Sequence, residues 1–262
     1  MQSARKDILN FVVTGEVRSG ASVVQTSVHS HPEATCHGDL LHPAPEMRRE
    51  VHEAYFGRQH SEEEPGGFFV KHLISAEQYL ETVVFDNAMH GEDVIGVKID
   101  YAAMRCFEMW DYMHEKGNVG DFCCVHVRRN PVACYISLKQ AKQTGLWYRD
   151  INDKTHYTYP TAVDIKPREL EMFVNMQLAS ETSLSRACED RLEITYKELF
   201  LNYHEVMDGV FEFLELPPFP DVSPGVRRLK NRNMLDRVSN LDLVINQLTP
   251  EVRELLDGDD LF

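Results

Sequence analysis

Apolar and polar residues follow two different spacings along the chain. Unbroken apolar runs at 10–15, 93–100, 121–129 and 192–196 are typical of strands buried on both faces of a parallel sheet. Between them, apolar residues recur at helical spacing, which predicts helices at 19–29, 45–56, 76–89, 101–116, 131–143, 168–187 and 204–216, with a brief strand or turn within 31–40. This alternation predicts an α/β fold in which helices flank both faces of a parallel sheet.

Length and composition favour one domain. The chain has 262 residues, of which 43% are hydrophobic, and no linker interrupts it, so we expect a single domain over 1–262. Two long loops are predicted, a charged one at 57–67 and an aromatic-rich one at 143–167. The second carries Trp147, Tyr148, His156, Tyr157 and Tyr159, and loops of this length often cover a binding site.

The end of the first strand has the layout of a loop that binds phosphate. Gly15 to Gly20 gives G-x-x-x-x-G and opens a helix, so the sheet is predicted to be a P-loop NTPase-like three-layer sandwich. Amides at a helix start favour an anion, and Arg18 adds a permanent positive charge. The lysine that usually follows the second glycine is absent, because Ala21 and Ser22 stand there.

The missing lysine weakens one interpretation. A metal-dependent kinase or nucleotide hydrolase needs that lysine and an acidic strand end for the metal. Asp100 is available for the second role, but Lys98 lies on the same strand face and adds positive charge. A sulfuryl group carries less charge than a phosphoryl group, so its transfer requires only fixed cations and amides. The kinase alternative stays open here.

Three segments resemble sulfotransferases that use 3′-phosphoadenosine 5′-phosphosulfate. The stretch "VRSGASVVQTSVHSHPEATCHGD" (17–39) is similar to their R-S-G-T-T…S-H-P…G-E segment. The stretch "VHVRRNPVACYISLKQA" (125–141) is similar to their strand–R-x-P–helix unit, and "ITYKELFLNYHEVMDGVFEFLEL" (194–216) to their Y-x-x-L segment. The resemblance covers most of the chain and implies this fold, this nucleotide as co-substrate, and no metal.

The resemblance also implies roles for individual residues. The 5′-phosphosulfate would be held by the loop residues Arg18, Ser19, Gly20, Ala21, Ser22 and Val23. Arg129 and Ser137 would bind the 3′-phosphate, and a basic residue of the 227–232 stretch, for which Lys230 is chosen, would close the donor site. Lys98, at the end of an apolar strand, is assigned with Arg18 to the charge that develops on the sulfuryl group.

The acceptor hydroxyl needs a base. Asp39 lies 21 residues after Arg18, where the family often has a glutamate, and it ranks ahead of His37, whose ordinary pKa also suits proton transfer. The replacement of the family's threonine by Ala21 and of glutamate by Asp39 leaves a further alternative, a nucleotide-binding homologue without catalysis. A zinc site among His29, His31, His37 and His42 is disfavoured because their spacing matches no ligand pattern.

Charge and cysteine content bear on the partners. A net charge of −15 disfavours nucleic acid and membrane surfaces, and together with the aromatic loop it favours a small acceptor bearing an amine or guanidinium, such as a cationic natural product. Six cysteines without paired spacing predict free, buried thiols in a reducing compartment. No signal-like or membrane-spanning run is evident, so a cytoplasmic protein is expected. The sequence does not indicate the oligomeric state.

Overall fold

A parallel sheet forms the centre of the molecule. The computed structural model describes residues 9–42, 75–85, 94–147, 149–150, 162–227 and 234–257. The five strands of the sheet are β1 (Leu9–Gly15), β2 (Ala34–His37), β3 (Val94–Asp100), β4 (Cys123–Arg128) and β6 (Arg191–Thr195). They pair in the order β2-β3-β1-β4-β6, and every pairing is parallel. β1 is therefore central, with β3 and β4 on either side.

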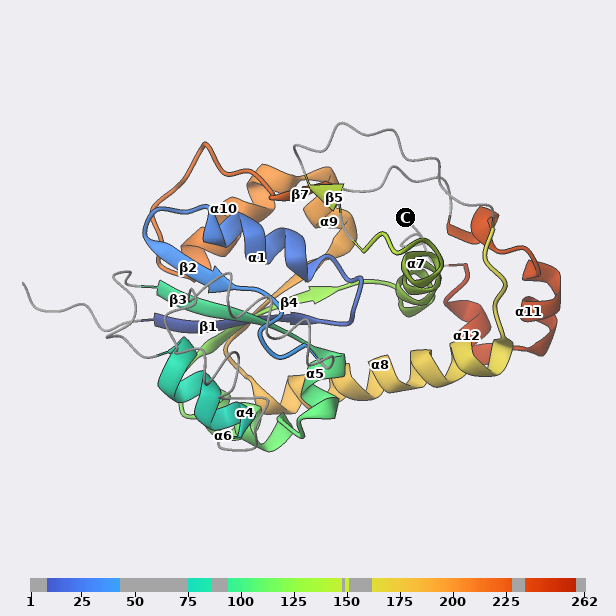
Figure 1. The fold of residues 1–262 in the computed structure, drawn as a ribbon, viewed down its shortest axis with the longest axis horizontal. Helices are drawn as coiled ribbons and strands as arrows, with labels where there is room; N and C mark the ends of the chain where they lie inside the picture. Colours follow the sequence, from blue (N-terminus) through green and yellow to red (C-terminus); the bar gives the residue numbers. More distant parts are fainter. Residues whose placement is uncertain are drawn as a thin grey trace, which may run out of the picture.

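Helices cover both faces of the sheet (Figure 1). On one face, which we call the upper face, lie α1 (Ala21–His29), α9 (Tyr196–Leu201) and α10 (Tyr203–Phe213). On the other, the lower face, lie α4 (Ala76–Tyr79), the π-helix η1 (Leu80–Val84), α5 (Tyr101–Cys106), α6 (Trp110–Asn118) and α8 (Pro167–Ala187). The predicted three-layer α/β architecture is confirmed.

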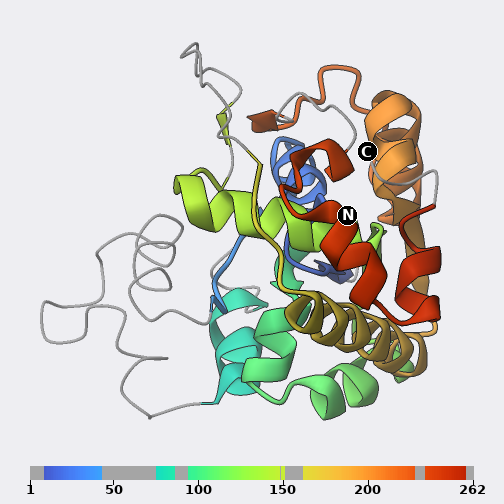
Figure 2. The same ribbon diagram turned by 90° about the vertical axis from the view of Figure 1, so that its right-hand side faces the viewer.

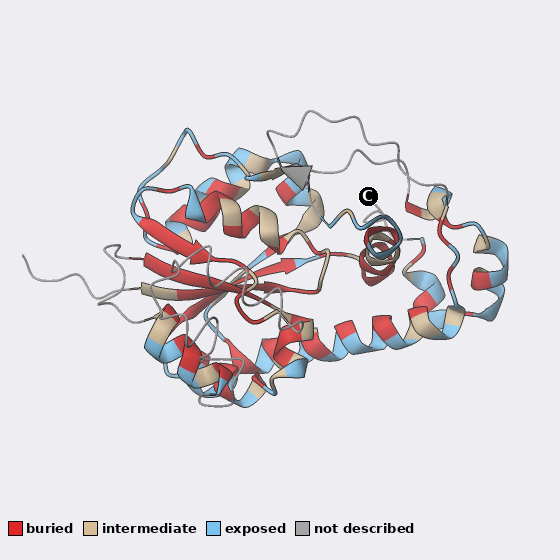
Figure 3. Ribbon diagram, in the orientation of Figure 1, coloured by how far each residue is buried: buried red, intermediate tan, exposed pale blue. Residues whose placement is uncertain are grey.

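Each face of the sheet has its own apolar core, and the buried strands lie between the two (Figure 3). Strand side chains alternate between faces. Cys123 accordingly belongs to the upper core and the adjacent Cys124 to the lower core, as their position in one strand predicts. All six cysteines are free thiols, but Cys106 is exposed, so the expectation that all are buried is wrong for that residue.

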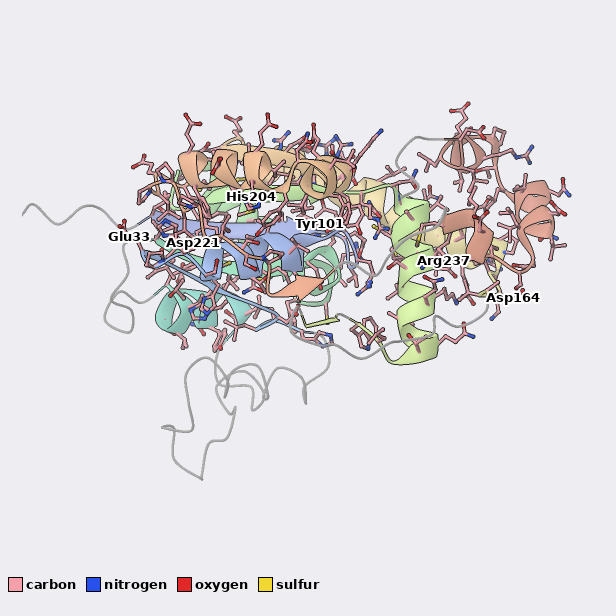
Figure 4. The ribbon with its side chains drawn as sticks, turned by 90° about the horizontal axis from the view of Figure 1, so that it is seen from above. Glu33, Tyr101, Asp164, His204, Asp221 and Arg237 are labelled. Carbon is pink, nitrogen blue, oxygen red and sulfur yellow. The ribbon has the colours of Figure 1, made fainter. Side chains whose placement is uncertain are left out.

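A third core lies beyond the carboxyl ends of the strands, and the sequence did not reveal it. Helix α7 (Pro131–Thr144) and the start of α8 pack there against η2 (Met234–Arg237), α11 (Leu241–Gln247) and α12 (Pro250–Glu254). Figure 2 looks onto this end of the molecule. Arg237 of η2 donates from Nη1 to Oε1 of Gln140 on α7, 2.9 Å away, and Figure 4 shows Arg237 beside that helix. The C-terminal helices thereby support α7.

Two short strands join distant segments. β5 (Arg149–Asp150) pairs antiparallel with β7 (Val226–Arg227), which places the segment after α7 next to the segment after α10. The amide of Gly225 donates to Oγ1 of Thr26 on α1, at 3.1 Å. The two segments predicted to close the substrate site therefore begin side by side above α1.

The predicted element boundaries need two corrections. The single helix expected over 101–116 is broken, because Glu108 has a positive φ of 54° and separates α5 from α6. The helical stretch from 76 begins with only one α-turn before it widens into the π-helix η1. The helix expected at 45–56 and the loop at 57–67 lie outside the described residues.

Candidate active site at the carboxyl ends of β1, β3 and β4

The loop between β1 and α1 is shaped by two glycines. A Cβ on Gly15 would lie 2.4 Å from the carbonyl oxygen of Val127 on β4, so only glycine lets these strands approach there. Gly20, in the left-handed region at φ 101°, is the N-cap of α1, and among the described residues no side chain caps this helix start. A helix that begins without a side-chain cap leaves its first amides for a ligand. The loop has the form of an anion site.

Arg18 lies in this loop with a left-handed backbone, at φ 74°. Its Nε donates to Oγ of Ser137 on α7 at 3.1 Å, and its Nη1 donates to the carbonyl oxygen of Trp147. Burial, reinforced by the charge of Arg129, lowers the pKa of Arg18 below its ordinary value. Within the described part of the chain these two partners are neutral, so the half-buried guanidinium of Arg18 has no carboxylate beside it there and is suited to bind an anion.

Arg129 follows β4 and is buried beside the same loop. Its Nη1 donates to the carbonyl oxygen of Arg18 at 2.8 Å, and its guanidinium lies 4.0 Å from the ring centroid of Tyr196 on α9. Gln177 of α8 donates from Nε2 to the carbonyl oxygen of Arg129 at 3.0 Å. A cation over an aromatic face is stabilised without being neutralised. The structure thus brings together Arg18, Arg129 and Ser137, as the sequence predicts.

Tyr196 is a site residue whose contacts the sequence did not predict. Besides Arg129, it faces the loop glycine, because a Cβ on Gly20 would lie 2.8 Å from Cδ2 of Tyr196. The ring therefore joins the loop after β1 to the arginine after β4. The Y-x-x-L segment contains Tyr196, but the spacing of residues in the sequence does not predict that its ring contacts Arg129 and Gly20.

Lys98 of β3 is buried, although it lies near the end of its strand. Its Nζ lies 2.5 Å from Oδ1 of Asp39 and 3.2 Å from Oγ of Ser22, to which it donates. The side chain of Asp39 is 39% exposed, whereas His37 is only 3% exposed within β2. Of the two candidate bases, Asp39 is the one within reach of solvent and of an incoming hydroxyl.

The remaining predicted loop residues differ in how they meet a ligand. Ser19 is buried, and its Oγ would lie 2.6 Å from a Cβ on Gly15, so its side chain supports the turn. The amide of Val23 already donates to the carbonyl oxygen of Gly20 at 2.9 Å. The amide of Val23 thus has a backbone partner in this structure, and the assignment of Ala21, Ser22 and Val23 to the donor stays a prediction. Lys230 lies outside the described residues, as do the aromatic loop residues after Trp147.

A second arginine near the loop has a carboxylate partner. Glu16, buried directly after β1, accepts from the amide of Val17 at 2.9 Å and pairs with Nη2 of Arg105 on α5 at 3.1 Å. Nη1 of Arg105 also donates to Oγ of Ser180 on α8, 2.7 Å away. Burial raises the pKa of Glu16, and Arg105 opposes that shift. Sequence reasoning missed this pair.

The residues considered for metal binding have structural partners. Asp100 caps α5, since its Oδ1 accepts from the amide of Ala103 at 2.8 Å. A ring nitrogen of His31 lies 3.0 Å from the carbonyl oxygen of Pro217. Among the described residues, no three His, Cys, Asp or Glu side chains gather as a metal site.

In the part of the chain that the structure describes, no helix has the length and apolar character needed to cross a bilayer.

Among solved structures, the chain is similar to a sulfotransferase domain from the curacin biosynthetic pathway, at a TM-score of 0.54 and 15% identity over 97% of this chain and 98% of that one. A sulfotransferase from Alicyclobacillus acidocaldarius has a TM-score of 0.47 and 14% identity over 96% of this chain and 100% of that one. The sulfotransferase domain of the Synechococcus PCC 7002 olefin synthase has a TM-score of 0.48 and 13% identity over 100% of this chain and 88% of that one. No protein-family model and no curated relative matches the sequence.

The fold is thus that of sulfotransferases, a P-loop-like α/β sandwich, as the first of these likenesses shows. At this level of identity the likeness extends to the fold, while activity must be argued from the site itself.

Proposed function

We propose that the protein is a sulfotransferase that moves a sulfuryl group from 3′-phosphoadenosine 5′-phosphosulfate to a hydroxyl of a small acceptor. The observation that carries the proposal is the convergence of Arg18, Arg129 and Ser137 on one loop of a sulfotransferase fold. Two guanidinium groups at one strand edge suit a nucleotide with phosphate groups on both sides of its ribose.

The residues at this edge suit such a nucleotide. Gly20 lets the backbone approach the ligand, the amides of Ala21 and Ser22 open α1, and Arg18 adds charge for the 5′-phosphosulfate. Arg129 and Ser137 lie where a 3′-phosphate would replace the neutral contact between Ser137 and Arg18. In this assignment Lys230 closes the site. The proposed reaction uses amides and fixed cations and requires no metal.

The proposed transfer is an in-line displacement. A bond forms between the acceptor oxygen and sulfur, while the bond between sulfur and the bridging phosphate oxygen breaks and releases adenosine 3′,5′-bisphosphate. The hydroxyl proton passes to a carboxylate oxygen of Asp39. Arg18 and Lys98 stabilise the negative charge that develops on the leaving and sulfuryl oxygens. The choice of Asp39 over His37 as the base is supported by the solvent exposure of the Asp39 side chain, since His37 is buried.

The acceptor is proposed to be a small cationic metabolite. The net charge of −15 attracts cations to the surface, and the loop after α7 is rich in aromatic residues. A similar fold from the curacin biosynthetic pathway agrees with a role in tailoring natural products. Activity confined to acidic polysaccharides would contradict this part of the proposal.

The first experiment measures ligand-induced thermal shifts. Adenosine 3′,5′-bisphosphate is expected to raise the melting temperature more than ATP with Mg²⁺ does, because only a ligand that binds the folded state stabilises it. The reverse order would favour the kinase alternative, and a shift by neither nucleotide would end the proposal.

The second experiment separates catalysis from binding. Asp39→Asn is expected to keep nucleotide binding and to lower turnover by about 10²- to 10⁴-fold, the usual contribution of a general base. Asp121→Asn is a matched control, because Asp121 also pairs with a lysine, Lys116 at 3.3 Å, but away from this loop. Full turnover in Asp39→Asn would show that the base is another group, and donor binding without any turnover in the native protein would favour the non-catalytic homologue.

A further inference from the structure

Lys98 connects the donor loop to the candidate base. Its ammonium contacts Asp39 Oδ1 at 2.5 Å and Ser22 Oγ at 3.2 Å, so one charge on β3 links the residue after β2 to the first turn of α1. The side chain of Lys98 is 9% exposed, compared with 39% for Asp39. The cation is therefore fixed by the fold, whereas the carboxylate stands at the solvent side.

The backbone of Asp39 indicates that this contact holds it in place. Asp39 has a φ of 54°, in the left-handed region, which is unfavourable for a residue with a Cβ. The ion pair with Lys98 offsets part of that cost in the free protein. An oxygen that faces the ammonium at 2.5 Å is occupied and is not available to an acceptor hydroxyl.

An incoming sulfuryl group would meet the same ammonium. Ser22 belongs to the helix start that is proposed to hold the 5′-phosphosulfate, and Lys98 already touches it. A lysine ammonium has three N–H donors, which its neighbours must share. Sulfuryl oxygens next to Ser22 therefore compete with Asp39 for Lys98.

We propose that Lys98 passes from Asp39 to the donor, so that Oδ1 of Asp39 is released to the acceptor only when the donor is bound. This inference rests on the proposed function. In the free protein Lys98 holds the Asp39 carboxylate; when the sulfuryl group takes over the ammonium, Asp39 turns to the acceptor hydroxyl. The product adenosine 3′,5′-bisphosphate lacks the sulfuryl group, so after transfer Lys98 returns to Asp39. Proton transfer to Oδ1 of Asp39 is thereby confined to the donor complex.

The test is a double-mutant cycle read by equilibrium binding of two nucleotides in the absence of acceptor. Asp39→Asn removes the competitor for Lys98, so affinity for 3′-phosphoadenosine 5′-phosphosulfate is expected to rise about tenfold. Affinity for adenosine 3′,5′-bisphosphate is expected to stay the same, because that nucleotide has no group to take over the ammonium. In a Lys98→Met background, Asp39→Asn is expected to change neither affinity.

The control pair is Lys116 with Asp121, since Lys116 also bridges two partners, Glu81 at 2.9 Å and Asp121 at 3.3 Å. Asp121→Asn is expected to leave both affinities unchanged. If Lys98→Met fails to fold by circular dichroism, Lys98→Gln takes its place in the cycle.

Two outcomes would overturn the inference in different ways. If both nucleotides bind but Asp39→Asn changes their two affinities equally or not at all, the ion pair is purely structural and the proposed function survives. If neither nucleotide binds the native protein, the proposed function fails together with the inference.

Discussion

Two arginines near the loop after β1 have opposite surroundings. On the lower side, Arg105 pairs with the buried carboxylate of Glu16 at 3.1 Å. On the upper side, Arg18 donates to a hydroxyl and a carbonyl oxygen, although burial lowers its pKa. A buried charge is stable when it is paired, so Arg105 has a structural partner, whereas Arg18 among its described partners has none and is proposed to bind the anionic donor. The loop therefore separates a structural half, around Arg105, from the half around Arg18 that is proposed to bind nucleotide, which we call the binding half.

The largest expected effect concerns the paired side. Arg105→Ala leaves Glu16 buried without its cation, so the free energy of unfolding is expected to fall by about 3 kcal/mol, measured by urea denaturation. Because the lower side is not proposed to touch nucleotide, affinity for adenosine 3′,5′-bisphosphate is expected to change little. Adding Glu16→Gln to this variant is expected to recover most of the loss. Native-like stability of Arg105→Ala would contradict the comparison.

The next effect concerns Arg18, whose described partners are neutral. Arg18→Ala is expected to change the stability of the free protein by less than about 1 kcal/mol, because a desolvated cation with neutral partners contributes little. Loss of its charge-assisted bonds is expected to weaken adenosine 3′,5′-bisphosphate about 100-fold by calorimetry. Arg128→Ala, at an exposed position of β4, is the control and is expected to retain binding. Severe destabilisation of Arg18→Ala with unchanged binding would reverse the assignment.

The third effect is a pH dependence that belongs to the lower face. His126 of β4 is buried against Tyr101, and burial lowers its pKa from 6.5 to about 4, with Glu193 opposing and Arg128 and Arg191 adding to the shift. Its folded pKa is depressed, so the unfolded state binds the proton first as the pH falls. Stability is then complete above pH 6.5 and is lost between 6.5 and about 4.

Between pH 7 and pH 5 this group alone is expected to remove about 2 kcal/mol from the free energy of unfolding. His126→Gln is expected to show a pH dependence that is weaker by that amount, measured by urea denaturation at both values. Identical pH dependence in the two proteins would show that His126 is not the responsible group.

The smallest effect sharpens the description of the binding half. Gly20→Ala places a Cβ 2.8 Å from Tyr196 at a φ of 101°, whereas Gly120→Ala has a similar φ of 79° and no atom within 4 Å. Both variants incur backbone strain of about 1 kcal/mol, and Gly20→Ala is expected to lose about 1 kcal/mol more through the displaced ring. Thermal denaturation measures the difference. Equal losses would mean that Tyr196 moves aside freely.

The sheet and the upper half of the site were predictable because the carboxyl ends of parallel strands meet at one edge of a sheet. Parallel strands that end in Gly15 and Arg128 bring Arg18 and Arg129 to one edge once β1 pairs with β4, as the register Val12 with Cys124 confirms. Apolar runs and one glycine spacing suffice for that inference. Whether these residues bind the nucleotide remains a prediction.

The lower half was not predictable for a local reason. A continuous helix over 101–116 gives no indication that Arg105 lies in the last turn of a short helix, whose end depends on the positive φ of Glu108. The pairing of Lys98 with Asp39 likewise depends on how the chain turns after β2. The third core was missed because its apolar residues in 234–257 find their partners on α7 and α8, far away in sequence.

The distribution of thiols has a practical consequence for following these events in solution. Five of the six cysteines are buried and Cys106 is exposed, one residue after Arg105. A maleimide dye would therefore attach to the unmodified protein at one preferred position, at the end of α5. Fluorescence from that dye would report directly on the structural half of the loop while nucleotide is titrated into the other half.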